Sequence, residues 1–408
     1  MPIEAGLRRA KDLAFWSLAG AVVAASFSNS LFEIFSGVFL GLSLLLVLLE
    51  KRTCIFKSFF GAAVAVYLGV VLITAVRSGY PAESWRGVFR VLRCALMSFF
   101  TVYLVDDENK FKKIFYIFAV SALFIALDAL AQGVFAVEFL RQRPMTPYSG
   151  QSGRVTGPFG HANDFAAYLS LTIFLFLGMA GRAFRGREWK ERLLFFTGTL
   201  ALGGCLLWTY SRGAWVGVAF ACILAALLKR DRAALAVLGA VLLSVFLLSP
   251  APLKGRIASF WDVRDATMKE RRLLWTEALE MTQERPWLGY GINTYSKIEP
   301  SFKSKAVYTD NQYAHNGYLQ IAAETGWLGL GAFLAVLFSF FAAAFPVHLK
   351  YRKEFVSAAA LSLTLGVFSF LVHSATDTNL QSLRLVSLLW LSMGLVLAAK
   401  QIKGSDVR

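Results

Sequence analysis

The feature that most limits the fold of this chain is a series of apolar blocks, each close to the length that a helix needs to cross a membrane. A helix spans the roughly 30 Å of bilayer hydrocarbon with about 20 apolar residues. Hydrophobic residues make up 57% of the 408-residue sequence, and charged residues only 17%. This pattern predicts an all-α, polytopic membrane protein rather than a soluble one.

Hydropathy predicts about twelve membrane spans. The first block follows Arg8, Arg9 and Lys11 but lacks a small-residue cleavage site, so it is interpreted as a retained span rather than a signal peptide. No repeat or low-complexity tract divides the chain, and residues 1–408 are expected to form a single transmembrane domain. The predicted spans lie near residues 13–29, 31–49, 55–76, 88–105, 113–135, 164–181, 193–210, 213–228, 233–249, 320–347, 356–374 and 384–400.

Every second connection between the spans is rich in Lys and Arg. These connections lie near residues 8–11, 51–57, 110–113, 182–192, 229–232, 350–353 and 400–408. Lys and Arg collect in cytoplasmic loops, so these connections and both termini are predicted to be cytoplasmic. Much of the formal net charge of +16 is therefore a topology signal, and no nucleic-acid partner is expected.

The opposite side of the membrane receives a short segment near residues 135–163 and a long connection from 250 to 316. Positive charge is normally scarce on that side, so the cations of the long connection predict an anionic ligand there. These cations are Lys254, Arg256, Arg264, Lys269, Arg271, Arg272, Arg285, Lys297, Lys303 and Lys305.

The long connection is expected to contain amphipathic helical structure. A capping-box spacing at Thr267 and helix-forming residues up to Gln283 predict one such helix. Helical spacing places five of its residues on one face, namely Arg271, Leu274, Trp275, Ala278 and Met281. After His315, we expect a short surface helix, a bend at Gly326, Gly329 and Gly331, and then the tenth span.

Histidines and arginines on the non-cytoplasmic side are the candidate functional groups. His161, His315 and His373 are each candidates for a base that activates a sugar hydroxyl, because histidine exchanges a proton near neutral pH. The alternative for His315 is a hydrogen bond to a helix start. Arg212, in a short turn between two spans, either binds an anion or reaches the lipid headgroups.

No metal or cofactor motif is present on this side. The sequence there lacks D-x-D, H-E-x-x-H and any cluster with ligand spacing. Asp262 and Asp265 are the nearest acidic pair, and their position in a predicted loop is weak evidence for a site. We therefore expect neither a metal ion nor a cofactor.

Four stretches of the sequence resemble motifs of the O-antigen ligase family, in the order found in that family. The resemblance covers residues 154 to 330, and the remaining spans agree in number and hydrophobicity. The stretches are Arg154-Val-Thr-Gly-Pro-Phe-Gly-His-Ala-Asn163, Tyr210-Ser-Arg-Gly-Ala-Trp215, Arg271-Arg-Leu-Leu-Trp275 with Arg285-Pro-Trp-Leu-Gly-Tyr-Gly291, and His315-Asn-Gly-Tyr-Leu319 leading to Glu324-Thr-Gly-Trp-Leu-Gly-Leu330.

This resemblance implies a GT-C-like fold and transfer of a completed O-antigen from undecaprenyl diphosphate to the lipid A core oligosaccharide. The reaction would be an inverting, metal-independent glycosyl transfer at the periplasmic face of the bacterial inner membrane. His315, Arg212 and Arg271 match the family's essential histidine and arginines, with Arg272 as the alternative match and His161 as a second candidate base. The other expected substrate-binding residues are Arg154, Asn163, Trp275, Arg285, Asn316 and Glu324.

Three other functions are considered. An O-antigen polymerase uses the same donor but extends a lipid-linked acceptor, and a protein-directed oligosaccharyltransferase of the same superfamily would be expected to carry a larger soluble part. A secondary transporter, in contrast, tends to place ionisable residues at the membrane midplane and to have repeated halves. The ionisable residues here crowd one outer face, which disfavours transport.

Overall fold

The structure, a computed structural model, is almost entirely helical in the residues that it describes. These are residues 2–51, 56–142, 144–148, 151–183, 189–230, 239, 251–258, 266–302, 313–350 and 354–405. The all-α prediction is confirmed for this part of the chain. The predicted span at 233–249 lies outside the described residues, apart from position 239, as do Arg264, Lys303 and Lys305 of the long connection.

The helices follow the predicted apolar blocks. Within the described residues, nine helices are long and apolar enough to cross a membrane, and they are α2, α3, α4, α5, α6, α8, α13, α14 and α15. Two further predicted spans coincide with α1 and α7, which begin with charged residues and so have shorter apolar stretches. The long helices are α1 (Pro2–Ala25), α2 (Asn29–Leu49), α3 (Phe59–Val76), α4 (Pro81–Leu104), α5 (Glu108–Phe135), α6 (Ala162–Ala183), α7 (Trp189–Trp208), α8 (Arg212–Lys229), α13 (Gly317–Lys350), α14 (Phe355–Ser374) and α15 (Leu383–Ser405).

Helices α14 and α15 lie at the centre of the bundle. In each of them 83% of the span is buried, against 28% for α8 and 33% for α2. Small residues permit close packing around α14: Gly366 faces the backbone of Leu171 on α6, and Gly217 of α8 faces the backbone of Ser369. Such contacts are common between membrane helices because small residues let the backbones approach. They fix the start of α8 beside the end of α14.

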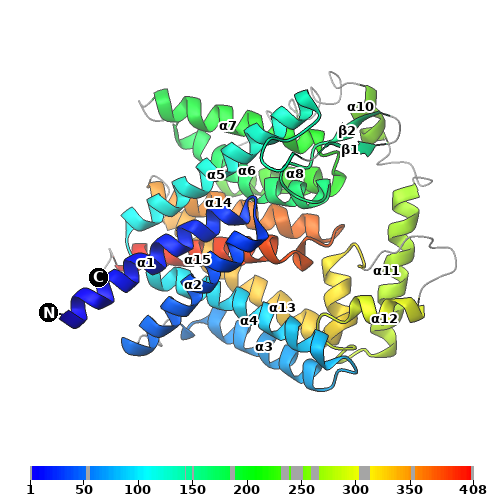
Figure 1. Cartoon of the computed structure of the whole chain (residues 1–408), viewed down its shortest axis with the longest axis horizontal. Helices are drawn as coiled ribbons and strands as arrows, with labels where there is room; N and C mark the ends of the chain where they lie inside the picture. The colour runs from blue at the N-terminus through cyan, green and yellow to red at the C-terminus, as the bar shows by residue number, and fades with distance from the viewer. Residues whose placement is uncertain are drawn as a thin grey trace.

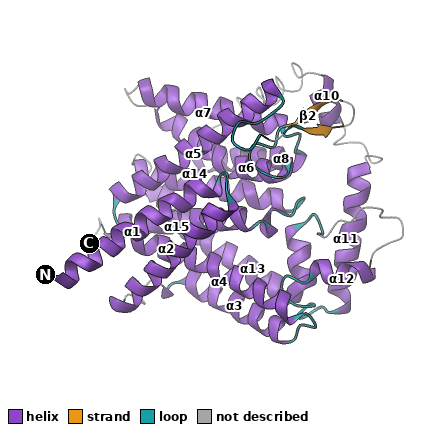
Figure 2. Ribbon diagram, viewed as in Figure 1, coloured by secondary structure: helices purple, strands orange, loops and turns teal. Residues whose placement is uncertain are grey.

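The two ends of the bundle differ. Both chain termini lie at one end, and three helices of the long connection lie toward the other end (Figure 1). These helices are α10 (Ala251–Ala258), α11 (Ala266–Glu284) and α12 (Tyr295–Phe302). Two short antiparallel strands, β1 (Thr146–Tyr148) and β2 (Gln151–Arg154), lie near α10 and were not predicted (Figure 2).

The amphipathic helix predicted in the long connection is confirmed as α11. It begins at Ala266, so Thr267 lies in its first turn rather than at the N-cap. Leu274, Ala278 and Met281 are completely buried, and Arg271 on the same face is partly buried. Burial of this apolar face holds α11 against the first part of α13.

The predicted bend after the short surface helix is also confirmed. Helix α13 is broken at Gly326, which has φ 69° and ψ −177°. The 286–291 loop packs into the bend: the Trp327 amide donates to the Pro286 carbonyl at 2.7 Å, and the Gly291 amide donates to the Glu324 carbonyl at 2.8 Å. A side chain at Gly326 would overlap the backbone of Trp287. The bend therefore connects the surface part of α13 to its membrane-spanning part.

Replacing Gly326 by Ala should destabilise the protein, because alanine is strained at this positive φ and has no room there. We expect the free energy of unfolding to fall by about 1–3 kcal/mol. The measurement is the melting temperature of the detergent-purified protein. Gly331→Ala is the matched control, since no atom lies within 4 Å of the carbon it would add. Equal melting temperatures for both variants would show that the bend is not required.

Candidate active site

A buried carboxylate, Asp377, is the centre of a charged cluster at the end of the bundle that carries α11 and α12. It lies between α14 and the short 3₁₀ helix η2 (Asn379–Gln381). Its Oδ2 is 3.2 Å from Arg271 Nη2 and 3.9 Å from His373 Nε2, and its Oδ1 is 3.7 Å from His315 Nδ1. The backbone of Thr378 donates to Oδ1 at 2.8 Å. Helices α11, α13 and α14 thus meet at one carboxylate.

The surroundings of Asp377 keep it ionised. Burial by itself raises the pKa of Asp377, but the neighbouring His315 side chain and the charges of His373 and Arg271 lower it more strongly. The pKa of Asp377 therefore lies well below that of an ordinary aspartate. A carboxylate in this state offers a fixed negative charge to the groups that surround it.

Arg271 reaches the cluster from α11, whereas its neighbour Arg272 does not. The Arg271 side chain is largely buried, at 16% exposure, and donates to Asp377. Arg272 is exposed to solvent. The geometry therefore places Arg271 rather than Arg272 beside His315.

The backbone of His315 is held in an unusual conformation. Its φ is +48°, in the left-handed region, and its carbonyl accepts a hydrogen bond from Trp275 Nε1 at 3.3 Å. Asn316 caps α13, because its Oδ1 accepts from the amides of Tyr318 at 3.0 Å and Leu319 at 3.1 Å. The helix cap is thus supplied by Asn316, which leaves the imidazole of His315 for other contacts. The His315 side chain is 26% exposed.

Arg212 is the first residue of α8. Ser211 precedes it, and the Ser211 hydroxyl is 3.3 Å from His373 Nε2. Gly213 follows it and faces His373 and Thr376 so closely that a side chain there would overlap both. Position 212 is thus next to His373, which in turn contacts Asp377, and Arg212 itself is buried. The positive end of the α8 dipole points to the same region.

The three histidines predicted on this side have different surroundings. His373 is completely buried, so it is closed to an acceptor sugar. His161, at the start of α6, is exposed and lies within electrostatic range of Asp164, which in turn interacts with Asp377. His315 combines a partly exposed side chain with a position beside Asp377.

Two residues predicted to bind substrate contact each other. Arg154 Nη2 donates to Asn163 Oδ1 at 2.6 Å, and Arg154 Nε donates to the Thr209 carbonyl at 2.7 Å. These bonds join β2 to the start of α6 and to the end of α7. In the structure, therefore, Arg154 and Asn163 hold the turn that leads to Arg212.

Glu324 and Arg285, also predicted to bind substrate, contact the 286–295 region. Glu324 is 1% exposed, and its carboxylate accepts from the amides of Asn293 at 2.7 Å and Tyr295 at 3.4 Å. The guanidinium of exposed Arg285 stacks 4.3 Å from the centre of the Tyr290 ring. Glu324 thereby ties the loop before α12 to the first half of α13.

Asp377 is the residue of this cluster that sequence reasoning missed. It follows His373 by four residues, immediately after a predicted span. Two ionisable residues at this spacing at a helix end share one face, and this was the available signal. The cluster also unites residues far apart in the chain, since Arg271 and Asp377 are separated by 106 positions.

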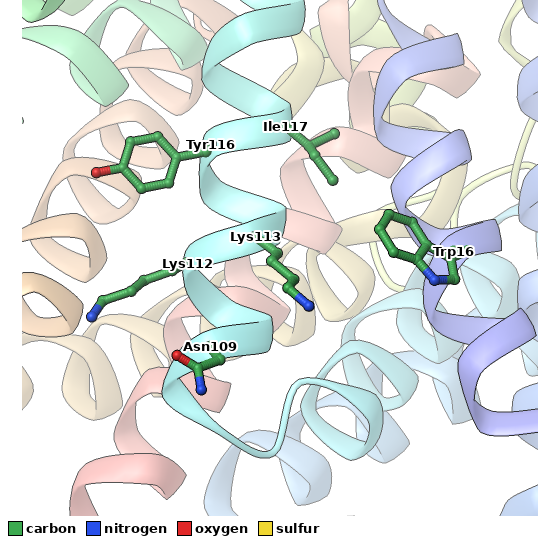
Figure 3. A pocket seen from close by; sticks show the side chains of 6 residues that line it. All are labelled: Trp16, Asn109, Lys112, Lys113, Tyr116 and Ile117. Carbon is green, nitrogen blue, oxygen red and sulfur yellow. The ribbon is translucent and has the colours of Figure 1, made fainter. Parts of the chain in front are cut away.

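The Asp377 cluster does not form a group of metal ligands. Among the described residues, no group of three or more His, Cys, Asp and Glu side chains could hold a metal ion, and Asp262 and Asp265 lie outside these residues. A surface hollow of about 570 Å³ lies beside the start of α5 (Figure 3), toward the end of the bundle that holds the termini (Figure 1). Its lining residues are Trp16, Asn109, Lys112, Lys113, Tyr116 and Ile117.

The middle of the chain is similar to known proteins. Residues 197–334 match the family model Wzy_C, described as O-antigen ligase. A curated protein of Acinetobacter baylyi, named general O-oligosaccharyltransferase, is 27% identical over 130 residues, which are 32% of this chain and 22% of that relative. Arg212, Arg271 and His315 all fall within the family match. The chain is thus a multi-pass membrane protein that carries an O-antigen ligase domain.

Proposed function

We propose that this protein is an O-antigen ligase, which transfers O-antigen polysaccharide from undecaprenyl diphosphate to the lipid A core oligosaccharide. The observation that carries the proposal is the contact of Arg271 and His315 with one ionised carboxylate, Asp377, in a chain with an O-antigen ligase domain. The cluster would face the periplasm, because the basic connections at the opposite end predict the cytoplasmic side.

In the proposed reaction, His315 is the general base. The proton of the acceptor hydroxyl passes to His315 while the oxygen forms a bond to the anomeric carbon of the donor. The bond from that carbon to the diphosphate breaks, and its electron pair stays on the diphosphate. Attack opposite the leaving group inverts the configuration of the carbon. Asp377 would hold the imidazole in position and stabilise the imidazolium that forms.

Arg271 and Arg212 would stabilise the charge that grows on the leaving diphosphate. A guanidinium has five N–H donors, and the ion pair with Asp377 involves one nitrogen of Arg271, Nη2. The remaining donors suit phosphate oxygens, which a planar guanidinium matches well. In many glycosyltransferases a divalent metal ion performs this task.

A second candidate function is oligosaccharyl transfer to a different acceptor. The name of the Acinetobacter relative, general O-oligosaccharyltransferase, favours this alternative, and an O-antigen polymerase would instead extend a lipid-linked acceptor. An assay of the purified protein with lipid-linked glycan and one acceptor at a time distinguishes the three functions. Growth of lipid A core supports the ligase, whereas growth of only a protein or a second lipid-linked glycan supports the alternatives.

Removal of the base or the paired arginine should reduce transfer strongly. For His315→Ala and Arg271→Gln we expect the rate to fall about 10²- to 10³-fold, because each loses a group that acts in the transition state. The measurement is the initial rate of glycan transfer to lipid A core at matched protein amounts in membranes. Arg272→Gln removes the same charge one residue away, at an exposed position, and should keep near-normal activity. Equal losses for Arg271→Gln and Arg272→Gln would contradict the assignment.

Replacing Asp377 by Asn should loosen α11. A hydrogen bond to a charged group contributes about 1.5–3 kcal/mol, so amide hydrogen exchange in α11 should rise about 10- to 100-fold. Lys269→Gln, at an exposed position of the same helix, is the control and should leave exchange unchanged.

The pH dependence of this effect follows from the lowered pKa of Asp377. The contribution of the carboxylate is fully present above the unfolded-state pKa, about 3.9, and is lost as the pH falls through the lower folded-state value. The difference in α11 amide hydrogen exchange between wild type and Asp377→Asn should therefore persist at about pH 5 and shrink only in more acidic solution. A difference that vanishes at neutral pH would argue against the ion pair.

Addition of a chelator should leave the transfer rate unchanged, because the guanidinium groups take the place of a metal ion at the leaving diphosphate. The test compares initial rates of purified protein with and without EDTA. A loss of activity that magnesium or manganese restores would refute metal-independent transfer.

A further inference from the structure

Three arginines form a stripe along α4, outside the Asp377 cluster. Arg86, Arg90 and Arg93 are separated by four and three residues, a spacing that places them on one face of a helix. Cationic side chains in such numbers are unusual in a membrane span. We call these three residues the α4 stripe.

The α4 stripe descends to about the middle of the membrane. The Tyr103 hydroxyl donates to Glu50 at 2.9 Å, near the end of the bundle that holds the termini. At 1.5 Å per residue, Arg93 lies about 15 Å along the helix from Tyr103, and Arg86 about 25 Å. Half of the hydrocarbon thickness is also about 15 Å. Ionisable residues at this depth commonly mark the path of a substrate or an ion.

The deepest arginine of the α4 stripe has a partner, Glu33, and that partner lies at the surface of the helix bundle. Arg93 Nη1 is 2.6 Å from Glu33 Oε2 on α2, and its Nη2 donates to Ser36 at 2.5 Å. The Glu33 side chain is 48% exposed. An ion pair of this kind is costly to bury in hydrocarbon, so its exposure indicates access for polar groups.

The stripe carries more positive charge than its surroundings neutralise. Glu33 offsets Arg93, and the buried Glu324 interacts with Arg90 over a longer range. Glu83, one turn before Arg86 on α4, is 3.9 Å from Lys297. Arg86 is exposed and forms no ion pair among the described residues. An anionic ligand is therefore expected at Arg86 and Arg90.

Arg86 lies beyond the beginning of α2, and Arg90 lies level with the first turn of α2. Helices α2 and α4 run in the same direction, since Phe39 contacts Phe100 further along both helices. Because Glu33, four residues into α2, is level with Arg93, the first two turns of α4 extend past the start of α2. Phe89, between the arginines, is 64% exposed. This part of α4 is thus open sideways to lipids.

The stripe leads directly to the proposed active site. Arg90 Nη2 donates to Gln381 Oε1 at 2.9 Å, and Arg90 Nη1 to the Gln381 carbonyl at 3.4 Å. Gln381 is four residues after Asp377, and the backbone amide of Gln381 donates to the backbone carbonyl of Thr378 at 2.8 Å. A lipid headgroup at Arg90 is therefore one short helical turn from the Asp377 cluster.

We propose that the α4 stripe is a lateral binding site for the phosphate groups of the lipid acceptor, separate from the arginines that hold the donor diphosphate. This inference rests on the proposed function. Guanidinium groups suit phosphate oxygens, and two lipid substrates that react with each other need two separate anchoring sites. The acceptor enters from the membrane along α4, and its phosphates at Arg86 and Arg90 position its sugar toward His315.

The test is the kinetics of two variants in nanodiscs. Arg86→Gln removes an exposed charge, and Arg90→Gln removes the second charge at which we place an acceptor phosphate. For each we expect the KM for acceptor to rise about 10-fold, while the KM for donor and the kcat stay unchanged. Arg77→Gln, an exposed arginine at the end of α3, is the matched control and should change neither. A rise in donor KM, or constants equal to those of Arg77→Gln, would overturn the proposal.

A binding measurement separates this inference from the proposed function. Native mass spectrometry would compare retention of the phosphorylated acceptor, the same lipid after phosphatase treatment, and phosphatidylglycerol. We expect wild type to retain the phosphorylated acceptor preferentially and both stripe variants to lose this preference. Equal retention of phosphatidylglycerol would overturn the proposal in favour of a general acidic-lipid site. Preferential retention without transfer by wild type would leave the stripe in place and reject the ligase function.

Discussion

The arrangement of the proposed active site depends on one buried charge, the carboxylate of Asp377. An unpaired carboxylate at this position would be strongly unfavourable, so the fold must bring positive or proton-donating groups to it. Arg271 comes from α11, His315 from the start of α13 and His373 from the end of α14. The same requirement that stabilises the carboxylate therefore assembles the groups that the proposed reaction uses.

The membrane architecture was predictable because its signal is local. A block of about 20 apolar residues becomes a helix wherever it lies in the chain, and the bend at Gly326 was readable from three closely spaced glycines. The apolar face of α11 was likewise predicted from helical spacing. Nine helices of the described residues are long and apolar enough to cross a membrane, whereas α1 and α7 carry charges near their starts that shorten their apolar stretches.

The centre of the site was not predictable in the same way. Arg271 and Asp377 are 106 residues apart, and nothing in the local sequence around Asp377 announces a contact with α11. The roles of Arg154 and Glu324 were also hidden, because both residues match motifs that suggest substrate contact, yet their side chains bond to neighbouring segments. Strands β1 and β2 are too short to show an alternating pattern.

The central claim is that the diphosphate of the donor binds between Arg212 and Arg271, and that the anomeric carbon of the attached glycan faces His315. Its most direct test is an experimental structure of the protein in lipid nanodiscs with a non-transferable analogue of the lipid-diphosphate donor. The account predicts phosphate oxygens within hydrogen-bond distance of both guanidinium groups and no bridging metal ion. Density for the diphosphate along the face of α4, or in the hollow beside Lys113, would contradict it.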